Sequence, residues 1–305
     1  MTVWRLHIRP GGVASDLNPT DFCIRNNLIA IGWPFKEKVS NIQSAIKVAE
    51  QKWPDDLRAF TSAFNAFMSK IAIDDLVWFR NREGKYFLAR VTSEFKQINN
   101  SEAFNVHCTN ARSAEIKEIG TQVAGGLKNQ FIRGSTIRRV ISRHLIDYTR
   151  LIAAKYFPHK YSDDLPKVFN IESIFSYLDP FDLEDVIGLY LQAEESFCII
   201  PSSRGNLSNT PFYEFELWRP IDGISAYLQV KSGDQNKLNL LQYSNFKDKL
   251  YVFSTAGYLN EDAINGHSNI CLIKKEDVIV FLQKHKDSLP GNIFCWIEFI
   301  GKQRI

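Results

Sequence analysis

The stretch 211–233, PFYEFELWRPIDGISAYLQVKSG, carries two acidic residues in one strand-like run and a Gln-x-Lys triplet in the next. Successive side chains of a β-strand point to opposite faces, so Glu214 shares a face with Glu216, and Gln229 shares one with Lys231. The intervening RPIDGIS contains a proline and an Asp-Gly pair, which is a turn signal. We therefore expect a hairpin that brings carboxylate, amide and ammonium groups onto neighbouring strands.

A helix is expected upstream of this hairpin, over residues 179–191. Asp179 is suited to cap it and Pro180 to occupy its first position, ahead of apolar residues at helical spacing. At ~100° per residue, Glu184 falls on the flank of the apolar stripe, whereas Asp185 points away from it. Glu184 is therefore the better candidate for a functional acidic residue on this helix.

This order of elements, a helix with a glutamate, an acidic strand and a strand ending in Gln-x-Lys, resembles the PD-(D/E)XK nuclease superfamily. The Gln-x-Lys form is similar to its Mrr-like restriction branch, and the likeness covers roughly residues 171–300. A leucine-rich, helix-like stretch and the strand LYVFSTAG follow the triplet, as in the nuclease core. The resemblance implies a restriction-endonuclease-like α/β/α domain that uses Mg²⁺ or Mn²⁺ to hydrolyse phosphodiesters.

The resemblance also implies a role for each residue of the motif. Glu214 would be the main metal ligand, Gln229 would contribute its amide oxygen and Val230 its carbonyl. Lys231 would be the catalytic ammonium that orients the water, and Glu184 would complete the site from the helix.

Two departures from the family pattern leave alternatives open. No Pro-Asp dipeptide precedes the acidic strand, and the usual aspartate is a glutamate, so Glu216 is an alternative acidic ligand to Glu214. Glutamine at 229 removes one negative charge, which lowers the expected metal affinity. An inactive, nuclease-like scaffold in a nucleic-acid-binding protein is therefore the alternative to an enzyme.

Composition excludes several classes of protein. The 305 residues, 45% hydrophobic and 23% charged, fit two globular domains, and the five cysteines are dispersed without zinc-like spacing. No apolar leader or membrane-length apolar run is present, so we expect a cytoplasmic protein that does not enter membranes. Neither a P-loop nor a G-x-S-x-G motif occurs, which argues against a P-loop NTPase and an α/β-hydrolase.

Basic residues are concentrated between Lys128 and Lys155, a segment that contains seven Lys or Arg and only one acidic residue. A long helix beginning near Ser135 is expected here, with Arg139 and Arg143 away from its apolar stripe and available to contact phosphate. An ordinary solvated helix face is the alternative. We place the domain boundary after this connecting helix, which gives domains 1–160 and 161–305.

The N-terminal half predicts mixed α and β structure. Strands are expected at VWRLHIRP and LIAIGW, helices over 42–53 and 57–71, and a hairpin in DLVWFRNREGKYFLARVTS that turns at Glu83 and Gly84. The IAIGWP, DLVWFR and YFLARVT segments resemble the EVE and wider PUA-like domains over roughly residues 1–135. This implies a small β-barrel with inserted helices that receives a flipped, modified base in an aromatic pocket.

Candidates for the pocket are aromatic residues in or beside these strands: Trp33, Trp78, Phe79 and Tyr86. Trp33 is preferred, because Gly32 and Pro34 flank it and suggest a strand end at a rim. The arginines that could contact phosphate beside the pocket are Arg80, Arg82 and Arg90. Each aromatic ring could equally belong to the core.

Together, the two halves predict a modification-dependent restriction endonuclease directed against phage DNA, with a base-reading N-terminal domain and a cleaving C-terminal domain. Cutting both strands requires two active sites, so a homodimer is expected. A nuclease that acts on RNA or single-stranded DNA is a further alternative, which the sequence cannot separate from the first.

Overall fold

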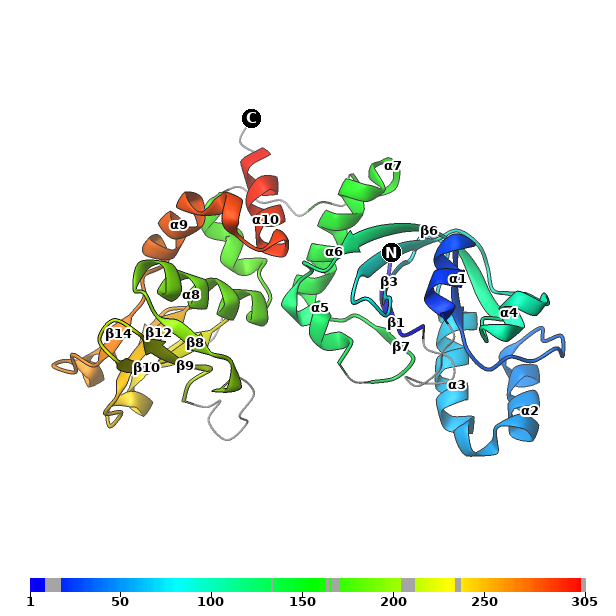
Figure 1. Ribbon diagram of the computed structural model, residues 1–305, viewed down its shortest axis with the longest axis horizontal. Coiled ribbons are helices and arrows are strands. Elements are labelled where there is room, and N and C mark those ends of the chain that lie inside the picture. The colour runs from blue at the N-terminus through cyan, green and yellow to red at the C-terminus, as the bar shows by residue number, and fades with distance from the viewer. Residues whose placement is uncertain are drawn as a thin grey trace. The chain divides into compact units, whose positions relative to one another are not determined.

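The computed structural model describes residues 1–8, 18–132, 134–162, 165, 170–203, 212–233 and 237–302. The chain forms two compact units (Figure 1). Unit 1 comprises Met1–Val123 and Leu127–Pro166, and unit 2 comprises Ala124–Gly126 and Lys167–Ile305. Each unit combines helices with a β-sheet, so the fold is mixed α and β, as the sequence predicts.

Unit 1 is built on a curled sheet with the strand order β2-β6-β4-β3-β1-β7, and β5 pairs with β6 (Figure 1). β1 lies parallel to β3 and antiparallel to β7. The strands are β1 (Val3–Leu6), β2 (Leu28–Ile31), β3 (Leu76–Arg80), β4 (Tyr86–Val91), β5 (Lys96–Gln97), β6 (Asn110–Gly120) and β7 (Ile137–Arg139).

The helices of unit 1 begin at the polar caps and prolines that the sequence provides. Asn41 and Ser44 form a capping box on α2, and Pro19 and Pro158 open α1 and α7. The helices are α1 (Pro19–Arg25), α2 (Ile42–Lys52), α3 (Leu57–Asn65) with a π-helical turn η2 (Ala66–Lys70), α4 (Ser101–Asn105), α5 (Gly125–Gln130), α6 (Arg143–Tyr156) and α7 (Pro158–Tyr161), and the first two residues of α5 belong to unit 2.

The sheet of unit 1 is buried on both faces. One face contributes Phe79 to the main core, in which Phe60 and Phe64 of α3 stack at 4.8 Å. On the other face, Trp78 donates from Nε1 to Thr149 Oγ1 of α6 at 2.9 Å and stacks on Tyr148. Double-sided burial explains why β3 reads as a continuous apolar run.

The prediction of a helix beginning near Ser135 is wrong for residues 135–142. Ile137–Arg139 form strand β7, which pairs with the edge of β1, and the helix begins only at Arg143. The unpaired backbone groups of β1 offer hydrogen bonds that local helical periodicity does not reveal. Arg139 therefore lies on a strand, while Arg143 lies in the first turn of α6.

Unit 2 contains a five-stranded mixed sheet with the order β14-β12-β10-β9-β8. β8, β9 and β10 are antiparallel neighbours, whereas β10, β12 and β14 are parallel. The strands are β8 (Cys198–Ile200), β9 (Phe215–Arg219), β10 (Ile224–Lys231), β12 (Lys249–Ser254) and β14 (Ile270–Leu272), with a separate pair β11 (Leu238–Asn239) and β13 (Tyr258–Leu259).

The main helix of unit 2 begins as the sequence predicts, with Asp179 as the cap and Pro180 in the first turn. The leucine-rich stretch after Lys231 forms β11 and one 3₁₀ turn rather than a longer helix. The helices are α8 (Pro180–Glu194), α9 (Lys275–Lys284) and α10 (Gly291–Lys302), with 3₁₀ turns η4 (Ile171–Ser176), η5 (Pro201–Ser203), η6 (Leu240–Tyr243), η7 (Glu261–Ile264) and η8 (Lys286–Ser288). None of the described helices is long and apolar enough to cross a bilayer.

The start of α8 holds two buried carboxyl groups side by side. Asp182 Oδ1 accepts from Gly125 N at 2.7 Å and from Asn292 Nδ2 at 2.8 Å, and Asp179 Oδ2 accepts from Gly126 N at 3.0 Å. A Cβ at Gly125 would lie 2.8 Å from Phe181 Cβ, so the backbone approaches as only glycine allows. Burial, together with the charge of Asp179, raises the pKa of Asp182 to about 8.

Replacing Asp182 by Asn should flatten the pH dependence of stability. An aspartate with a raised folded-state pKa stabilises fully below its unfolded pKa of about 4, and this contribution is lost as the pH rises toward about 8. We expect Asp182→Asn to exceed the wild type in unfolding free energy by about 1–2 kcal/mol near pH 8, and by less near pH 5. Urea unfolding at both pH values measures this, and parallel pH dependences in the two proteins would contradict it.

Candidate functional site

The pairing of β9 with β10 brings Glu214 and Gln229 together. Glu216 is opposite Tyr227 in the register and Phe215 is opposite Leu228, and the N–H of Glu214, in the bend just before β9, also donates to Leu228 O at 2.7 Å. The side chains of Glu214 and Gln229 meet there, because Gln229 Nε2 donates to Glu214 Oε1 at 3.2 Å. The two residues form a contact between a carboxylate and an amide on one face of the sheet.

Gln229 is buried, with only 4% of its surface exposed, yet its amide oxygen has no hydrogen-bond donor in the described part of the chain. Its Nε2 donates to Glu214 and also lies 3.1 Å from Val230 O. Buried acceptors nearly always have a partner, because leaving one unsatisfied costs about 1–3 kcal/mol. An amide oxygen left in this way beside a carboxylate is suited to bind a cation.

Lys231 ends the same strand two residues further on and is exposed. Strand alternation puts it on the face of Gln229, opposite Ser254 of β12. Ser254 is buried, and its Oγ has no partner among the described residues. Burial raises the pKa of Tyr243 to about 12, and the negative charge of Glu214 also raises it. Lys231 is thus exposed at the end of β10, whereas Gln229 and Ser254, on the same face of the sheet, are buried.

Glu214, just before β9, and Glu216, within β9, have different partners. Glu214 contacts Gln229, whereas Glu216 Oε1 accepts from Tyr213 Oη at 3.1 Å. The backbone N of Glu216 donates to Ser203 Oγ at 2.9 Å. This geometry favours Glu214 as the partner of Gln229.

Glu184 approaches the sheet from the other side. A Cβ at Gly188 would lie 2.7 Å from Ile199 Cδ1, so α8 packs on the face that carries Ile199. The register Ile199–Leu217–Ala226 shows that this face is opposite to that of Gln229. Because α8 leads directly into β8, which runs parallel to β10, its first turns lie toward the carboxyl end of β10. Glu184 therefore lies toward the end of the sheet at which β10 finishes with Lys231. It is on the opposite face from Gln229, the face that carries Val230.

The atoms on this face that could bind a metal ion are oxygens, namely those of the Glu214 carboxylate and the Gln229 amide. Oxygen ligands of this kind suit Mg²⁺ and Mn²⁺. Within the described ranges, no group of three or more His, Cys, Asp or Glu side chains could hold a metal. The residues therefore fit a hard divalent cation, but with less negative charge than a site with three carboxylates.

Binding of Mn²⁺ should depend on the buried amide oxygen. At a concentration of 100 times its Kd, Mn²⁺ should stabilise the wild type by about 2.7 kcal/mol, and Gln229→Met should lose this increment. Without metal, the Met variant should retain the stability of the wild type within about 1 kcal/mol, since removal of the buried amide oxygen offsets the loss of the hydrogen bond from Nε2 to Glu214. Thermal unfolding with and without Mn²⁺ tests this, with the exposed Gln192→Met as control. An equal Mn²⁺ effect in both variants would disprove the assignment.

In unit 1, Trp33 lies directly after β2 with a left-handed backbone, at φ 60°. It is half-buried, and its ring meets Phe60 edge-on at 5.5 Å. Asn110 Nδ2 donates to the carbonyl oxygens of Gly32 and Trp33 at 3.1 and 2.9 Å, which holds this backbone in place. Asn110 is fully buried, yet its Oδ1 has no partner among the described residues. Trp33 is therefore half-buried, and the side chain that holds its backbone has an amide oxygen without a partner among the described residues.

The other aromatic candidates are more deeply buried. Trp78 and Phe79 are fully buried on opposite faces of β3 and pack against α6 and the main core, respectively. Tyr86 is 4% exposed and meets Phe131 edge-on at 5.4 Å. These rings stabilise the sheet, and in this conformation neither Trp78 nor Phe79 has a free face for a base to stack on.

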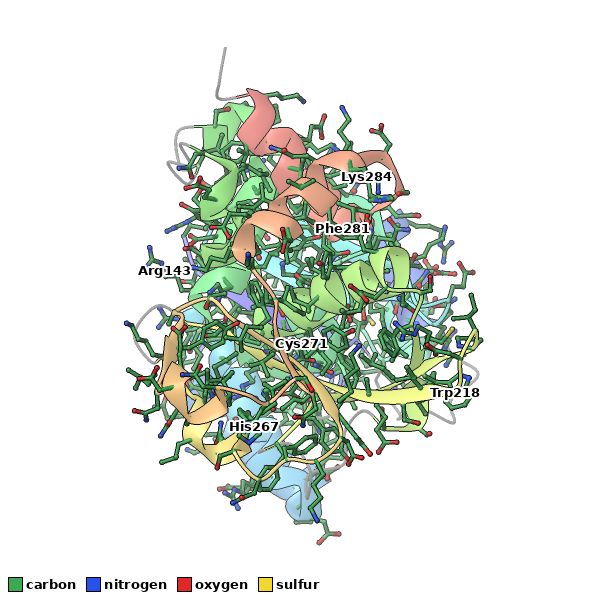
Figure 2. The ribbon with its side chains drawn as sticks, turned by 90° about the vertical axis from the view of Figure 1, so that its left-hand side faces the viewer. Arg143, Trp218, His267, Cys271, Phe281 and Lys284 are labelled. Atoms are coloured by element: carbon green, nitrogen blue, oxygen red, sulfur yellow. The ribbon has the colours of Figure 1, made fainter. Side chains whose placement is uncertain are left out.

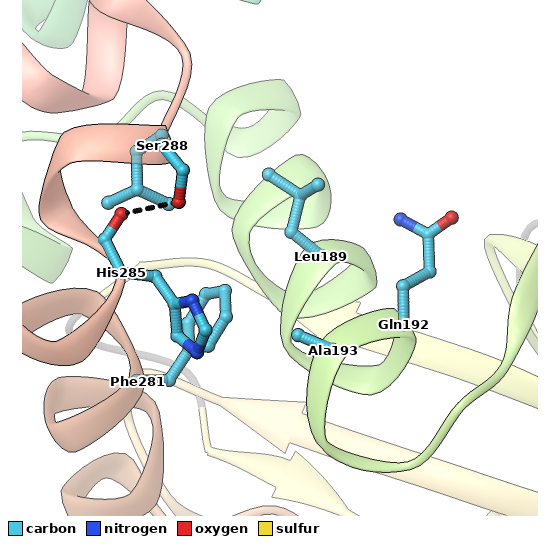
Figure 3. A pocket seen from close by; sticks show the side chains of 7 residues that line it. Leu189, Gln192, Ala193, Phe281, His285 and Ser288 are labelled. Carbon is cyan, nitrogen blue, oxygen red and sulfur yellow. Dashed lines mark hydrogen bonds between the residues drawn. The ribbon is translucent and has the colours of Figure 1, made fainter.

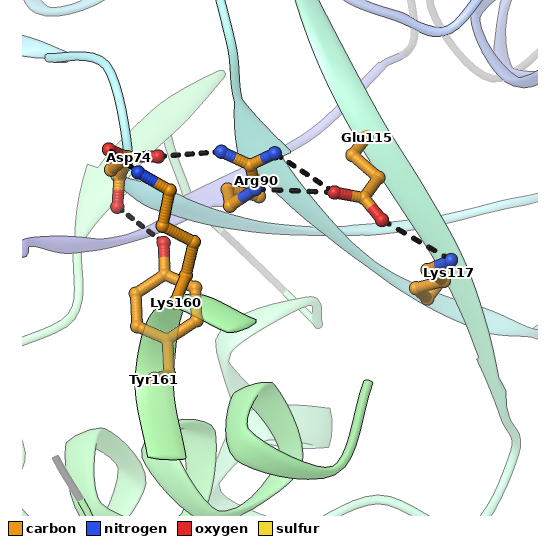
Figure 4. Close-up of polar contacts among 6 residues, drawn as sticks. All are labelled: Asp74, Arg90, Glu115, Lys117, Lys160 and Tyr161. Carbon is orange, nitrogen blue, oxygen red and sulfur yellow. Dashed lines mark hydrogen bonds and ion pairs between the residues drawn. The ribbon is translucent and has the colours of Figure 1, made fainter. Parts of the chain in front are cut away.

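Arg90 is held in an ion-pair network (Figure 4). It contacts Asp74 at 2.7 Å and Glu115 at 3.0 Å, and Glu115 also pairs with Lys117. Hydrogen bonding to Arg90 lowers the pKa of Asp74. The charge of Arg90 is thus already balanced within the protein.

The remaining arginines of the prediction differ in exposure. Arg82 and Arg139 are exposed, and the Arg143 side chain is 90% exposed with a 3.7 Å contact to Asp147 (Figure 2). Arg80 is half-buried and lies over the Tyr86 ring at 5.9 Å.

A cavity of about 260 Å³ opens between α8 and α9 (Figure 3). It is lined by Leu189, Gln192, Ala193, Phe281, His285, Ser288 and Leu289. His285 Nε2 lies 3.2 Å from Glu194 Oε1, which also pairs with Lys284. Since α8 covers the face opposite to Gln229, this cavity is separate from the Glu214–Gln229 contact.

No family model, curated protein or solved structure was found that matches this chain.

Proposed function

We propose that the protein is a metal-dependent DNA endonuclease that acts in modification-dependent restriction or defence against phage. In this proposal, unit 2 is a PD-(D/E)XK-like domain that hydrolyses the phosphodiester, and unit 1 is an EVE/PUA-like domain that reads a base. The observation that carries the proposal is the buried Gln229 oxygen, which has no donor among the described residues and lies beside Glu214 and two residues before the exposed Lys231.

The order of elements in unit 2 also supports the nuclease domain. The helix with Glu184 precedes the acidic strand, which pairs with the Gln-x-Lys strand, and β12 then lies parallel to β10. That is the order on which the resemblance to the nuclease superfamily rests. The short η6 turn in place of a longer helix is a departure from it.

Each residue has a chemical task in this proposal. Glu214 and Gln229 would hold Mg²⁺ or Mn²⁺ through their oxygens, and a bound ion of this kind lowers the pKa of an attacking water and neutralises phosphate charge. Lys231, at the end of its strand, can reach a phosphate that approaches from solvent and stabilise its developing charge. Glu184 can approach only around the end of the sheet.

The base-reading role is assigned to Trp33 together with Asn110. A half-buried indole can stack on a flipped base, and an unsatisfied amide oxygen can accept a hydrogen bond from the edge of that base. Flipping costs a few kcal/mol, which favours altered or weakly paired bases. The proposal further includes a homodimer, since two strands require two sites, and a cytoplasmic location, where phage DNA is met.

Lys231→Ala should abolish cleavage of DNA while leaving DNA binding intact. Loss of a charged group that acts on the transition state lowers kcat by about 10²–10³-fold. The measurement is cleavage with Mg²⁺ or Mn²⁺ of matched DNAs that carry cytosine, 5-methylcytosine, 5-hydroxymethylcytosine or glucosylated cytosine. Lys247→Ala, which removes an exposed lysine from the same unit, is the control. Equal cutting by Lys231→Ala and Lys247→Ala would rule out the catalytic role.

Trp33→Ala should remove the preference for modified DNA without removing cleavage. Trp53 is the matched control, because it is also half-buried and stacks on Phe60 at 6.1 Å. We expect Trp33→Ala to weaken binding of modified DNA by about 1–3 kcal/mol, the value of one stacked base. Competition between modified and unmodified duplexes measures this difference. If Trp53→Ala erased the preference equally, general loss of packing would account for the effect.

One observation favours an alternative function. The described residues provide no group of three or more metal-ligating side chains of the His, Cys, Asp or Glu type. A nucleic-acid-binding protein whose nuclease-like unit is a scaffold would show this, and it would bind DNA without cutting it under any metal condition.

A further inference from the structure

Arg5 is a buried cation that pairs with no carboxylate among the described residues. It lies in the middle of β1 and is fully buried. Its Nη1 donates to the Ser135 carbonyl, while Nε and Nη2 have no partner among the residues that the structure describes. A guanidinium has five N–H donors, and burying it without acceptors is strongly unfavourable. Arg5 therefore has N–H donors that no described residue uses.

Arg112 shows how the same unit satisfies a structural arginine. It is equally buried, but its Nε donates to Phe67 O and its Nη2 to Met68 O, both at 2.9 Å. Its Nη1 donates to Ser93 O at 3.1 Å and lies 3.3 Å from Glu94 Oε2. The contrast indicates that Arg5 is not simply a structural residue of this kind.

Further positive charge lies next to Arg5. Arg138 is its direct partner in the antiparallel register of β1 and β7, so both side chains are on one face of the sheet. Arg80 is on the same face, because Arg5 pairs with Trp78 and side chains alternate along β3. Nε of Arg80 is also buried without a partner in the described ranges. Burial, followed by the charge of Arg138, lowers the pKa of Arg5 to about 10.

Aromatic rings and a close backbone complete the surroundings. Phe131 lies 5.9 Å from the Arg5 guanidinium and meets the rings of Tyr86 and His7 edge-on. Gly134 has φ 123°, and a Cβ there would lie 2.9 Å from Arg5 Nη2. A glycine at this position lets the chain pass directly over the guanidinium.

We propose that Arg5, Arg80 and Arg138 form a binding site for a phosphate monoester, as found on a nucleotide or on the end of a nucleic acid strand. The planar guanidinium fork matches phosphate oxygens in a bidentate manner, and three arginines without a carboxylate suit a dianion. Phe131 and Tyr86, which are both buried, form the apolar side of the site. The site lies within unit 1 and does not depend on the nuclease proposal.

The test is thermal unfolding of the full chain with inorganic phosphate, against sodium chloride at matched ionic strength. Phosphate well above its Kd should raise Tm by about 3–5 °C beyond the salt control. Arg58→Gln, which removes an exposed arginine of α3, should keep this shift. Absence of a phosphate-specific shift in the wild type would overturn the proposal.

Two variants separate ligand binding from a structural role. Arg5→Met should lose the phosphate shift and, without phosphate, should melt at or above the wild-type Tm, because an unpaired buried charge has been removed. Arg138→Gln, on the exposed side of the site, should weaken phosphate binding about tenfold or more. Retention of the full shift in Arg138→Gln would overturn the proposal even if Arg5→Met failed to fold.

Oligonucleotides and a nucleoside monophosphate identify the source of the phosphate. Tighter binding of a 5′-phosphorylated strand than of the same strand with a 5′-hydroxyl, lost in Arg138→Gln, would indicate a nucleic acid end. Binding of the nucleoside monophosphate, with no difference between the two strands, would indicate a free nucleotide. If neither molecule bound more weakly to Arg138→Gln than to the wild type, the proposed site would be wrong.

Discussion

The register between β9 and β10 determines which side chains of unit 2 share a face. Side chains alternate along a strand, so a slip of one residue would move Glu214 and Gln229 to opposite sides of the sheet. The turn fixes the register: Arg219 holds Asp222 at 2.7 and 3.0 Å, and Asp222 Oδ1 accepts from Ile224 N. Gly223 takes the positive φ of 70° that closes the turn. The geometry of the candidate site therefore depends on four residues that take no part in its chemistry.

Elements with strong local signals could be predicted from the sequence. Asp179 and Pro180 mark the start of α8, and Pro220 and the Asp-Gly pair mark the β9–β10 turn, because caps and turns are determined by neighbouring residues. Once the hairpin is assumed, alternation puts Glu214 and Glu216 on one face and Gln229 and Lys231 on one face, but it does not select Glu214 as the partner of Gln229. The fold class, mixed α and β, was accessible for the same reason.

Features set by distant partners could not be predicted. Residues 137–139 join a sheet because β1 offers an edge, and a local helical pattern carries no information about that edge. The burial of Trp78 depends on α6, which lies about seventy residues along the chain. Asn110, Ser254 and Arg5 carry no motif, and their unsatisfied atoms become visible only when their surroundings are known.

Some of the buried groups that have no partner among the described residues lie at the candidate sites. Gln229 lies beside Glu214, Asn110 beside Trp33, and Arg5 beside Arg138. Each reduces stability in the absence of a ligand, and such local conflicts are expected where a sequence is selected for binding rather than for folding alone.

The Gly125–Gly126 segment has a consequence for dividing the chain. It is part of unit 2, although the residues before and after it belong to unit 1, so the chain passes between the units three times. A fragment that begins at residue 161 would lack the backbone N–H groups of Gly125 and Gly126, which donate hydrogen bonds to Asp182 and Asp179. It would also expose Phe181, against which Gly125 packs. Cleavage of the chain between residues 160 and 161 therefore does not give two complete units. Unit 2 also needs Ala124–Gly126, which lie between two segments of unit 1 in the sequence.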